Sequence, residues 1–119
     1  MEFTNMENLS LNEYQAKAIS SAIYPRFRDG TIPLYPVLGL TGEAGEVAEK
    51  VKKILRDKNG FATEEDKQEI AKELGDVLWY IANLAKDLNY SLEEIGQINL
   101  DKLNDRKDRG ALGGSGDNR

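Results

Sequence analysis

The feature that most constrains this chain is a repeated pattern, Glu-x-Gly-acid-Val, which occurs as EAGEV at residues 43–47 and as ELGDV at residues 73–77. Both copies lie in segments whose apolar residues recur at the spacing of an amphipathic helix. On a helical wheel, the first acid of each copy lies at the edge of the apolar stripe, and the second lies about 60° further round. The two copies therefore have the same phase. Antiparallel packing of the two helices would bring four carboxylates together, namely Glu43, Glu46, Glu73 and Asp76.

Local start and stop signals place two helices in the first half of the chain. Ser10 caps a helix near residues 11–24, which a following proline ends. Pro36 then lies in the first turn of a second helix. This helix carries the first copy of the repeat and runs to about residue 57, where the sequence Lys-Asn-Gly at 58–60 is a stop signal.

Two further helices follow the same logic in the second half. Thr63 caps a helix that runs to about residue 88, and Ser91 caps a last helix that runs to about residue 109. No segment alternates as a strand would. We therefore predict an all-α fold, a four-helix bundle-like single domain over residues 1–119 with a flexible Gly-rich tail at 110–119.

The composition excludes several classes of chemistry. The 119 residues include no cysteine and no histidine, which removes the usual zinc ligands, thiol and Ser-His catalysis, and the Glu-x-x-His pattern of di-iron bundles. A net charge of -5 argues against general nucleic-acid binding, and no apolar run is long enough to span a membrane. Because no signal peptide is recognisable either, we expect a cytoplasmic protein without nucleic-acid or membrane partners.

Four carboxylates beside a core repel one another unless a cation lies among them. Oxygen ligands without histidine or cysteine favour Mg²⁺, with Mn²⁺ as a substitute. Gly45 and Gly75 occupy the same position in each copy, where a missing side chain would let the helices approach closely. The alternative is a non-catalytic helical interaction module with a solvated acidic face, in which pairs such as Glu46–Lys50 and Glu49–Lys53 are ordinary surface pairs.

At these residues the sequence resembles the MazG-like, all-α nucleoside triphosphate pyrophosphohydrolases. Their signature is EExxE followed, after a spacer, by ExxD. Residues 42–46 match the first half, with Gly42 in place of the first Glu, and residues 73–76 match the second half. The resemblance to short phage and bacterial members extends to the segments Tyr14-Gln15, Leu34-Tyr35-Pro36, 76–80 and 114–119.

The resemblance implies hydrolysis of a (deoxy)nucleoside triphosphate between the α and β phosphates, which gives the monophosphate and pyrophosphate. It implies Glu43, Glu46, Glu73 and Asp76 as catalytic residues and Mg²⁺ ligands, with Glu43 or Glu46 accepting the proton of the attacking water. The dUTPase-like and phosphoribosyl-ATP pyrophosphohydrolase branches are alternative substrate assignments. Since family members associate, we also expect a homo-oligomer, either a tetramer made of two dimers or a dimer.

Other side chains are candidates for substrate contact. Tyr80 follows Asp76 by one turn and would stack on a base, or else is an aromatic residue at the edge of the core, while Asn83 would hydrogen-bond to the nucleoside. Trp79 points away from the apolar stripe and is expected at an oligomer contact rather than under a base. Gln15 would contact a base edge, or else is a solvated helix residue. The candidate phosphate ligands are cations, with a solvated basic helix end as the alternative for the C-terminal ones: Lys50, Lys53, Lys102, Arg106, Arg109 and Arg119.

Overall fold

The computed structural model describes residues 8–26, 31, 33–110 and 113–117. Its helices are α1 (Leu11–Ser20), α2 (Leu34–Lys58), α3 (Glu64–Asp87) and α4 (Leu92–Asp108), and these described residues contain no strand. The all-α fold class predicted from the sequence is confirmed. No helix in the described ranges has both the length and the apolar character needed to cross a membrane.

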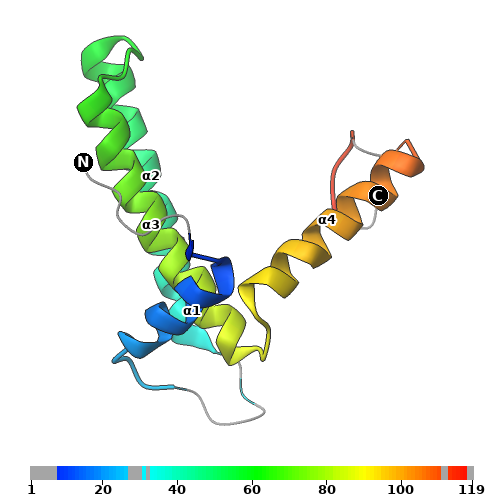
Figure 1. Cartoon of the computed structure of the whole chain (residues 1–119). Coiled ribbons are helices and arrows are strands. Elements are labelled where there is room, and N and C mark those ends of the chain that lie inside the picture. The colour runs from blue at the N-terminus through cyan, green and yellow to red at the C-terminus, as the bar shows by residue number, and fades with distance from the viewer. Residues whose placement is uncertain (1–7, 27–30, 32, 111–112, 118–119) are drawn as a thin grey trace.

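The helices α2 and α3 pack along each other as a long antiparallel hairpin (Figure 1). At the end of α2, Asn59 adopts a left-handed conformation with φ of 52°, and the amide of Gly60 donates to the carbonyl of Ile54 at 3.2 Å. At the start of α3, the Thr63 hydroxyl accepts from the amide of Asp66, whose carboxylate in turn accepts from the amide of Thr63. These local signals join the two helices by a short turn and so fix them as neighbours.

The first helix is shorter than predicted, because α1 ends at Ser20 rather than near residue 24. The hydroxyl of Ser20 donates to the carbonyl of Lys17 at 2.6 Å, and the hydroxyl of Ser21 donates to the carbonyl of Ala18 at 2.8 Å. Serine side chains that bond to nearby carbonyls in this way compete with the next turn of a helix. The prediction overlooked this competition.

The fourth helix does not complete a bundle with the other three. Within the described part of the chain, α4 contacts α1 and α3 but not α2, and it extends away from the hairpin (Figure 1). The turn between α3 and α4 contains Asn89 with φ of 66°. Gln15 of α1 holds this turn, since its amide nitrogen donates to the carbonyls of Ala82 and Tyr90 and its oxygen accepts from the amide of Leu92, at 3.0–3.1 Å.

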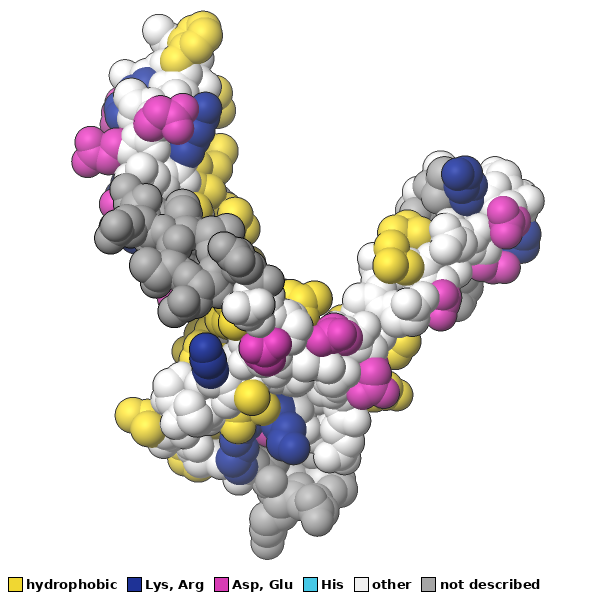
Figure 2. Space-filling view, viewed as in Figure 1, with side chains coloured by type: hydrophobic (Ala, Val, Ile, Leu, Met, Phe, Trp, Pro, Cys, Tyr) yellow, Lys and Arg dark blue, Asp and Glu magenta, His cyan; other side chains and the backbone are white. Residues whose placement is uncertain are grey.

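The fully buried core is small and lies where α1, α3 and α4 meet, formed by Ala18, Ala82, Ala85 and Leu92. The radius of gyration is 17.1 Å, whereas a compact chain of this length has about 13.5 Å. The accessible surface of 8963 Å² likewise exceeds the roughly 6,500 Å² expected for a folded monomer of this mass. Hydrophobic side chains line the edge of the hairpin that faces α4 (Figure 2). A single copy therefore leaves much apolar surface uncovered.

Candidate functional site

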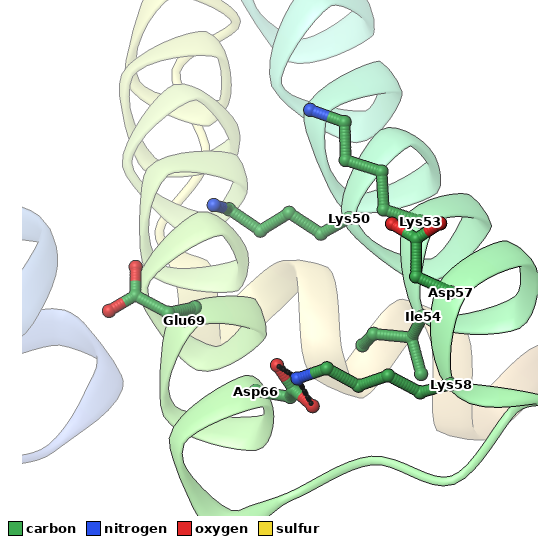
Figure 3. A pocket seen from close by; sticks show the side chains of 7 residues that line it. All are labelled: Lys50, Lys53, Ile54, Asp57, Lys58, Asp66 and Glu69. Atoms are coloured by element: carbon green, nitrogen blue, oxygen red, sulfur yellow. Dashed lines mark hydrogen bonds and ion pairs between the residues drawn. The ribbon is translucent and has the colours of Figure 1, made fainter.

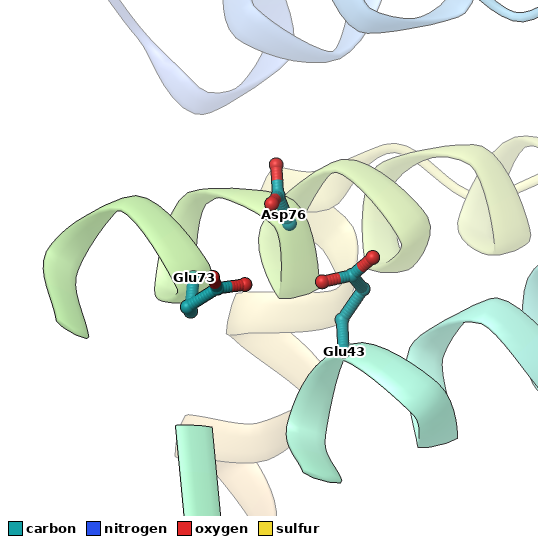
Figure 4. A group of neighbouring side chains, drawn as sticks. All are labelled: Glu43, Glu73 and Asp76. Carbon is teal, nitrogen blue, oxygen red and sulfur yellow. The ribbon is translucent and has the colours of Figure 1, made fainter. Parts of the chain in front are cut away.

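Three of the four predicted carboxylates come together between α2 and α3. One oxygen from each of Glu43, Glu73 and Asp76 lies within 4.8 Å of the other two, and Glu43 and Glu73 are half-buried. Figure 4 shows Glu43 of α2 and Glu73 of α3 pointing toward each other. Burial raises the pKa of Glu43, and the negative charges of Asp76 and Glu73 act in the same direction. We call these residues the carboxylate group, and their oxygens form a donor set suited to a hard divalent cation.

Glu46 is not part of the carboxylate group. It lies one turn further along α2 and is exposed, although its charge still contributes to the raised pKa of Glu43. Glu49 is also exposed and pairs with Lys52 at 3.0 Å. The wheel correctly placed the first acid of each copy at the helix interface. The second acids of the two copies differ, because Asp76 belongs to the carboxylate group and Glu46 does not.

The glycines of the repeat do not bring α2 and α3 close together, contrary to the sequence-based interpretation. A Cβ atom added to Gly45 or Gly75 would meet no atom within 4 Å, so both positions face open space. The close approach occurs instead at Gly39, one turn before the carboxylate group, where an added Cβ would collide with the ring of Tyr80. Only glycine leaves room for that ring.

A charged hollow of about 260 Å³, lined by three lysines and three acids, lies on the hairpin (Figure 3). Lys50 extends from α2 toward α3, and its ammonium lies 3.8 Å from the Glu73 carboxylate. Lys53 lines the same hollow, while Lys58 is paired with Asp66 at 2.8 Å. The structure thus brings both lysines predicted for phosphate contact to the neighbourhood of the carboxylates.

An aromatic hollow of about 320 Å³ lies on the other side of the carboxylate group. Tyr24, Tyr35, Trp79 and Tyr80 line it, with Tyr24 and Tyr35 stacked at 4.7 Å and Trp79 edge-on to Tyr80 at 5.0 Å. Burial raises the pKa of Tyr80, as do its interaction with Tyr35 and the negative charge of Glu43. Tyr80 therefore lies between the carboxylate group and this hollow, at the edge where the sequence placed it.

Three polar or aromatic candidates form hydrogen bonds within the fold. Gln15 is buried and both ends of its amide bond to the turn before α4, so it braces this turn and is not a solvated helix residue. Asn83 is fully buried, accepts from Arg26 at 2.7 Å and donates to the carbonyl of Trp79 at 3.0 Å. Trp79 is half-buried, and its indole nitrogen donates to the Ser21 hydroxyl at 2.9 Å, because α1 covers the face that the wheel left open.

The C-terminal cations do not reach the carboxylate group in this chain, because α4 diverges from the hairpin. Arg106 is buried and donates to the carbonyl of Asp117 at 2.6 Å, while Lys102 pairs with the Asp117 carboxylate at 3.1 Å. Arg109 pairs with Asp105 at 2.9 Å. The described part of the tail therefore folds back onto α4. Arg119 lies outside the described residues.

Sequence reasoning overlooked several residues around the site. Tyr35 was noted only as part of a helix start, and Arg26 and Asp87 lacked any local signal, because they meet across 61 positions of sequence. Tyr14 of α1 also lies near the group, since burial and the negative charge of Asp76 raise its pKa. Its position one turn after the Ser10 cap gave no indication of that neighbour.

Comparison with known proteins assigns the hairpin and α4 to one family model. Residues 34–110 match the MazG nucleotide pyrophosphohydrolase domain. The chain is 53% identical over 109 residues to the Gene 37 protein of Mycobacterium phage L5, covering 89% of this chain and 96% of that protein. It is 41% identical over 86 residues to the uncharacterized protein YpjD of Bacillus subtilis strain 168, covering 71% and 77% respectively. No solved structure matches the chain.

Proposed function

The chain belongs to the MazG nucleotide pyrophosphohydrolase family, and we propose that it hydrolyses (deoxy)nucleoside triphosphates between the α and β phosphates, releasing the nucleoside monophosphate and pyrophosphate. The observation that carries this proposal is the convergence of Glu43, Glu73 and Asp76 to within 4.8 Å between two packed helices. A solvated acidic face would spread its charges. Here two of the three carboxylates are half-buried against each other.

The donor set fits Mg²⁺ or Mn²⁺. The three groups are carboxylates, the described chain offers no softer ligand nearby, and their mutual repulsion would be relieved by a divalent cation. Glu43, Glu73 and Asp76 would hold it. When bound, such a cation neutralises phosphate charge and polarises the phosphate oxygens.

The remaining roles, proton acceptance and phosphate binding, are assigned to other side chains of the chain. Glu46 is exposed and outside the carboxylate group, so it is free to accept the proton of the attacking water. Lys50 and Lys53 lie in the charged hollow and offer their ammonium groups to the leaving pyrophosphate. Since Lys50 is only 3.8 Å from Glu73, binding of phosphate there is coupled to the charge of the carboxylates.

The nucleoside is proposed to occupy the aromatic hollow on the opposite side. A base is planar, and Tyr35, Trp79 and Tyr80 provide aromatic surfaces around a space of about 320 Å³. The triphosphate would then run from this hollow, past the carboxylate group, to the lysines. This order places the bond between the α and β phosphates beside Glu43, Glu73 and Asp76.

We also propose that the protein works as a homo-oligomer, either a dimer or a tetramer of two dimers. The surface of one copy exceeds that of a typical monomer by roughly 2,500 Å², which is more than a standard interface buries in total, about 1,600 Å². Exposed apolar side chains on the hairpin include Val51, Leu55 and Leu74. A second copy that covers them would supply the missing burial, and light scattering after size-exclusion chromatography measures the assembly directly.

The experiment that tests the function is pyrophosphate release from a panel of ribo- and deoxynucleoside triphosphates with Mg²⁺. Glu73→Gln and Asp76→Asn should abolish release, whereas Glu49→Gln, which changes an exposed acid outside the group, should not. A uniform lack of release, together with no response of thermal stability to Mg²⁺, would support the non-catalytic interaction module instead.

A further inference from the structure

A partly buried polar network lies directly behind the aromatic hollow and is not used by the carboxylate group. Its Tyr24 and Asn83 are buried, whereas the Arg26 side chain is 34% exposed. Arg26, in the segment after α1, forms an ion pair with Asp87 near the end of α3. The same guanidinium donates to the hydroxyl of Tyr24 at 2.6 Å and to the side-chain oxygen of Asn83 at 2.7 Å. The Asp87 side chain is 12% exposed and also accepts from the hydroxyl of Tyr24 at 3.3 Å.

This network holds Tyr24, which forms one wall of the aromatic hollow. The hydroxyl of Tyr24 is held by Arg26 and Asp87, and its ring is stacked on Tyr35 at 4.7 Å with an angle of 11° between the planes. The ring also meets Trp79 edge-on at 6.2 Å. Tyr24 is buried although it belongs to an irregular segment whose neighbour Ile23 is 98% exposed, so these hydrogen bonds and ring contacts hold it in place.

The network also fixes the orientation of the Asn83 amide. Its oxygen accepts from Arg26, so its nitrogen is the end that donates to the carbonyl of Trp79. Asn83 is fully buried, and a buried amide that lost one partner would turn or leave the position. One guanidinium therefore holds Tyr24, which lines the hollow, and Asn83, which is buried and bonds to the backbone of Trp79, another lining residue. A lysine could keep the charge, but it lacks the planar fork that contacts three partners at once.

We propose that the Arg26–Asp87 pair is a positioning element for nucleoside selection: by holding Tyr24, which lines the aromatic hollow, it sets the width of the hollow and hence which base is accepted. Neither residue contacts the reacting phosphates in this proposal. The inference rests on the proposed function, since it assigns the base to the aromatic hollow. Loss of the pair should widen the hollow and weaken discrimination between bases, while the carboxylate group stays intact.

The test compares Arg26→Lys and Asp87→Asn with the wild type over a panel of nucleoside triphosphates. We expect KM for the preferred nucleotide to rise by about tenfold, the ratio of kcat/KM between preferred and poor bases to fall, and kcat to stay within about twofold. The Mg²⁺ concentration for half-maximal activity should not change. The matched control is Arg56→Lys, which alters an exposed Arg56–Asp57 pair on α2 and should leave every parameter unchanged.

A second measurement uses the only tryptophan of the chain, Trp79, as a probe in the wild type. Titration with nucleoside monophosphates in the absence of metal should change its fluorescence, with the same order of base preference as kcat/KM. The inference is overturned if the fluorescence does not respond. It is equally overturned if the Arg26 and Asp87 variants keep wild-type discrimination, or lose kcat for all bases at unchanged KM. A wild type without activity on any nucleotide refutes the proposed function itself, which is a different outcome.

Discussion

Removal of one charge from the carboxylate group should make the metal-free protein more stable. The oxygens of Glu43, Glu73 and Asp76 lie within 4.8 Å, and two unit charges at that distance repel by about 0.9 kcal/mol even at the dielectric constant of water. Glu43→Gln removes two such pairs, so we expect the free energy of unfolding in EDTA to rise by about 1–2 kcal/mol. The amide can still donate a hydrogen bond to Glu73.

The same substitution should remove the response to metal. In the wild type, free Mg²⁺ at ten times its Kd adds about 1.4 kcal/mol to the free energy of unfolding, which for a chain of this size corresponds to an increase in Tm of about 5 °C. We expect Glu43→Gln to show less than half of that increase. Thermal unfolding followed by circular dichroism, at one protein concentration and with ionic strength matched by NaCl, measures both effects.

The pH dependence of the free energy of unfolding provides a further check on whether the carboxylates repel one another. Because the pKa of Glu43 is raised above its usual 4.5 in the folded protein, the folded state binds the proton more tightly than the unfolded chain. The stability of the metal-free protein should therefore fall as pH rises from 4.5 through the raised pKa, and less so in Glu43→Gln. Glu49→Gln is the control and should behave as wild type. A Glu43→Gln protein that is no more stable in EDTA, or that keeps the full Mg²⁺ response, would refute the reasoning.

Four other substitutions test separate parts of the description. Gln15→Leu removes three hydrogen bonds to backbone groups, of which those to Ala82 and Leu92 are buried, and should lower the free energy of unfolding in urea by about 2 kcal/mol. Gly39→Ala should displace the Tyr80 ring and raise KM for nucleotides, with little change in the Mg²⁺ response. Lys53→Met should raise KM for triphosphates but not weaken inhibition by the monophosphate product. In the wild type, Lys58 and the Thr63 cap lower the pKa of Asp66 to about 2, so part of the free energy of unfolding is lost as the pH falls from 3.8 to about 2. In Asp66→Asn, an acid titration should show a smaller loss over the same range.

Features encoded within a few residues were predictable from the sequence. The caps at Ser10, Thr63 and Ser91 and the turn at Asn59 all occur where local rules place them, because each depends on hydrogen bonds to residues three to six positions away. The first acids of the two copies, Glu43 and Glu73, also lie on the side of the helix that the wheel predicted, because the phase of a residue follows from helix geometry alone.

Features that depend on contacts between distant segments were not predictable. Gln15 resembles a surface residue until the turn after α3 is placed against it, and the Arg26–Asp87 pair forms only once the segment after α1 crosses the end of α3. The direction of α4 has the same origin. Local signals define a helix there, but the angle at which it leaves depends on the partners of Tyr90 and Leu92.

The short turn between α2 and α3 has a consequence for how the protein reaches its native state. All three members of the carboxylate group lie on α2 and α3, which residues 59–63 connect. Contacts between neighbouring elements of this kind close small loops and form early in folding, whereas contacts over long sequence separations form later. The site can therefore assemble before the segment containing Arg26 docks. During folding, the protein would become able to bind metal before it becomes able to select a base.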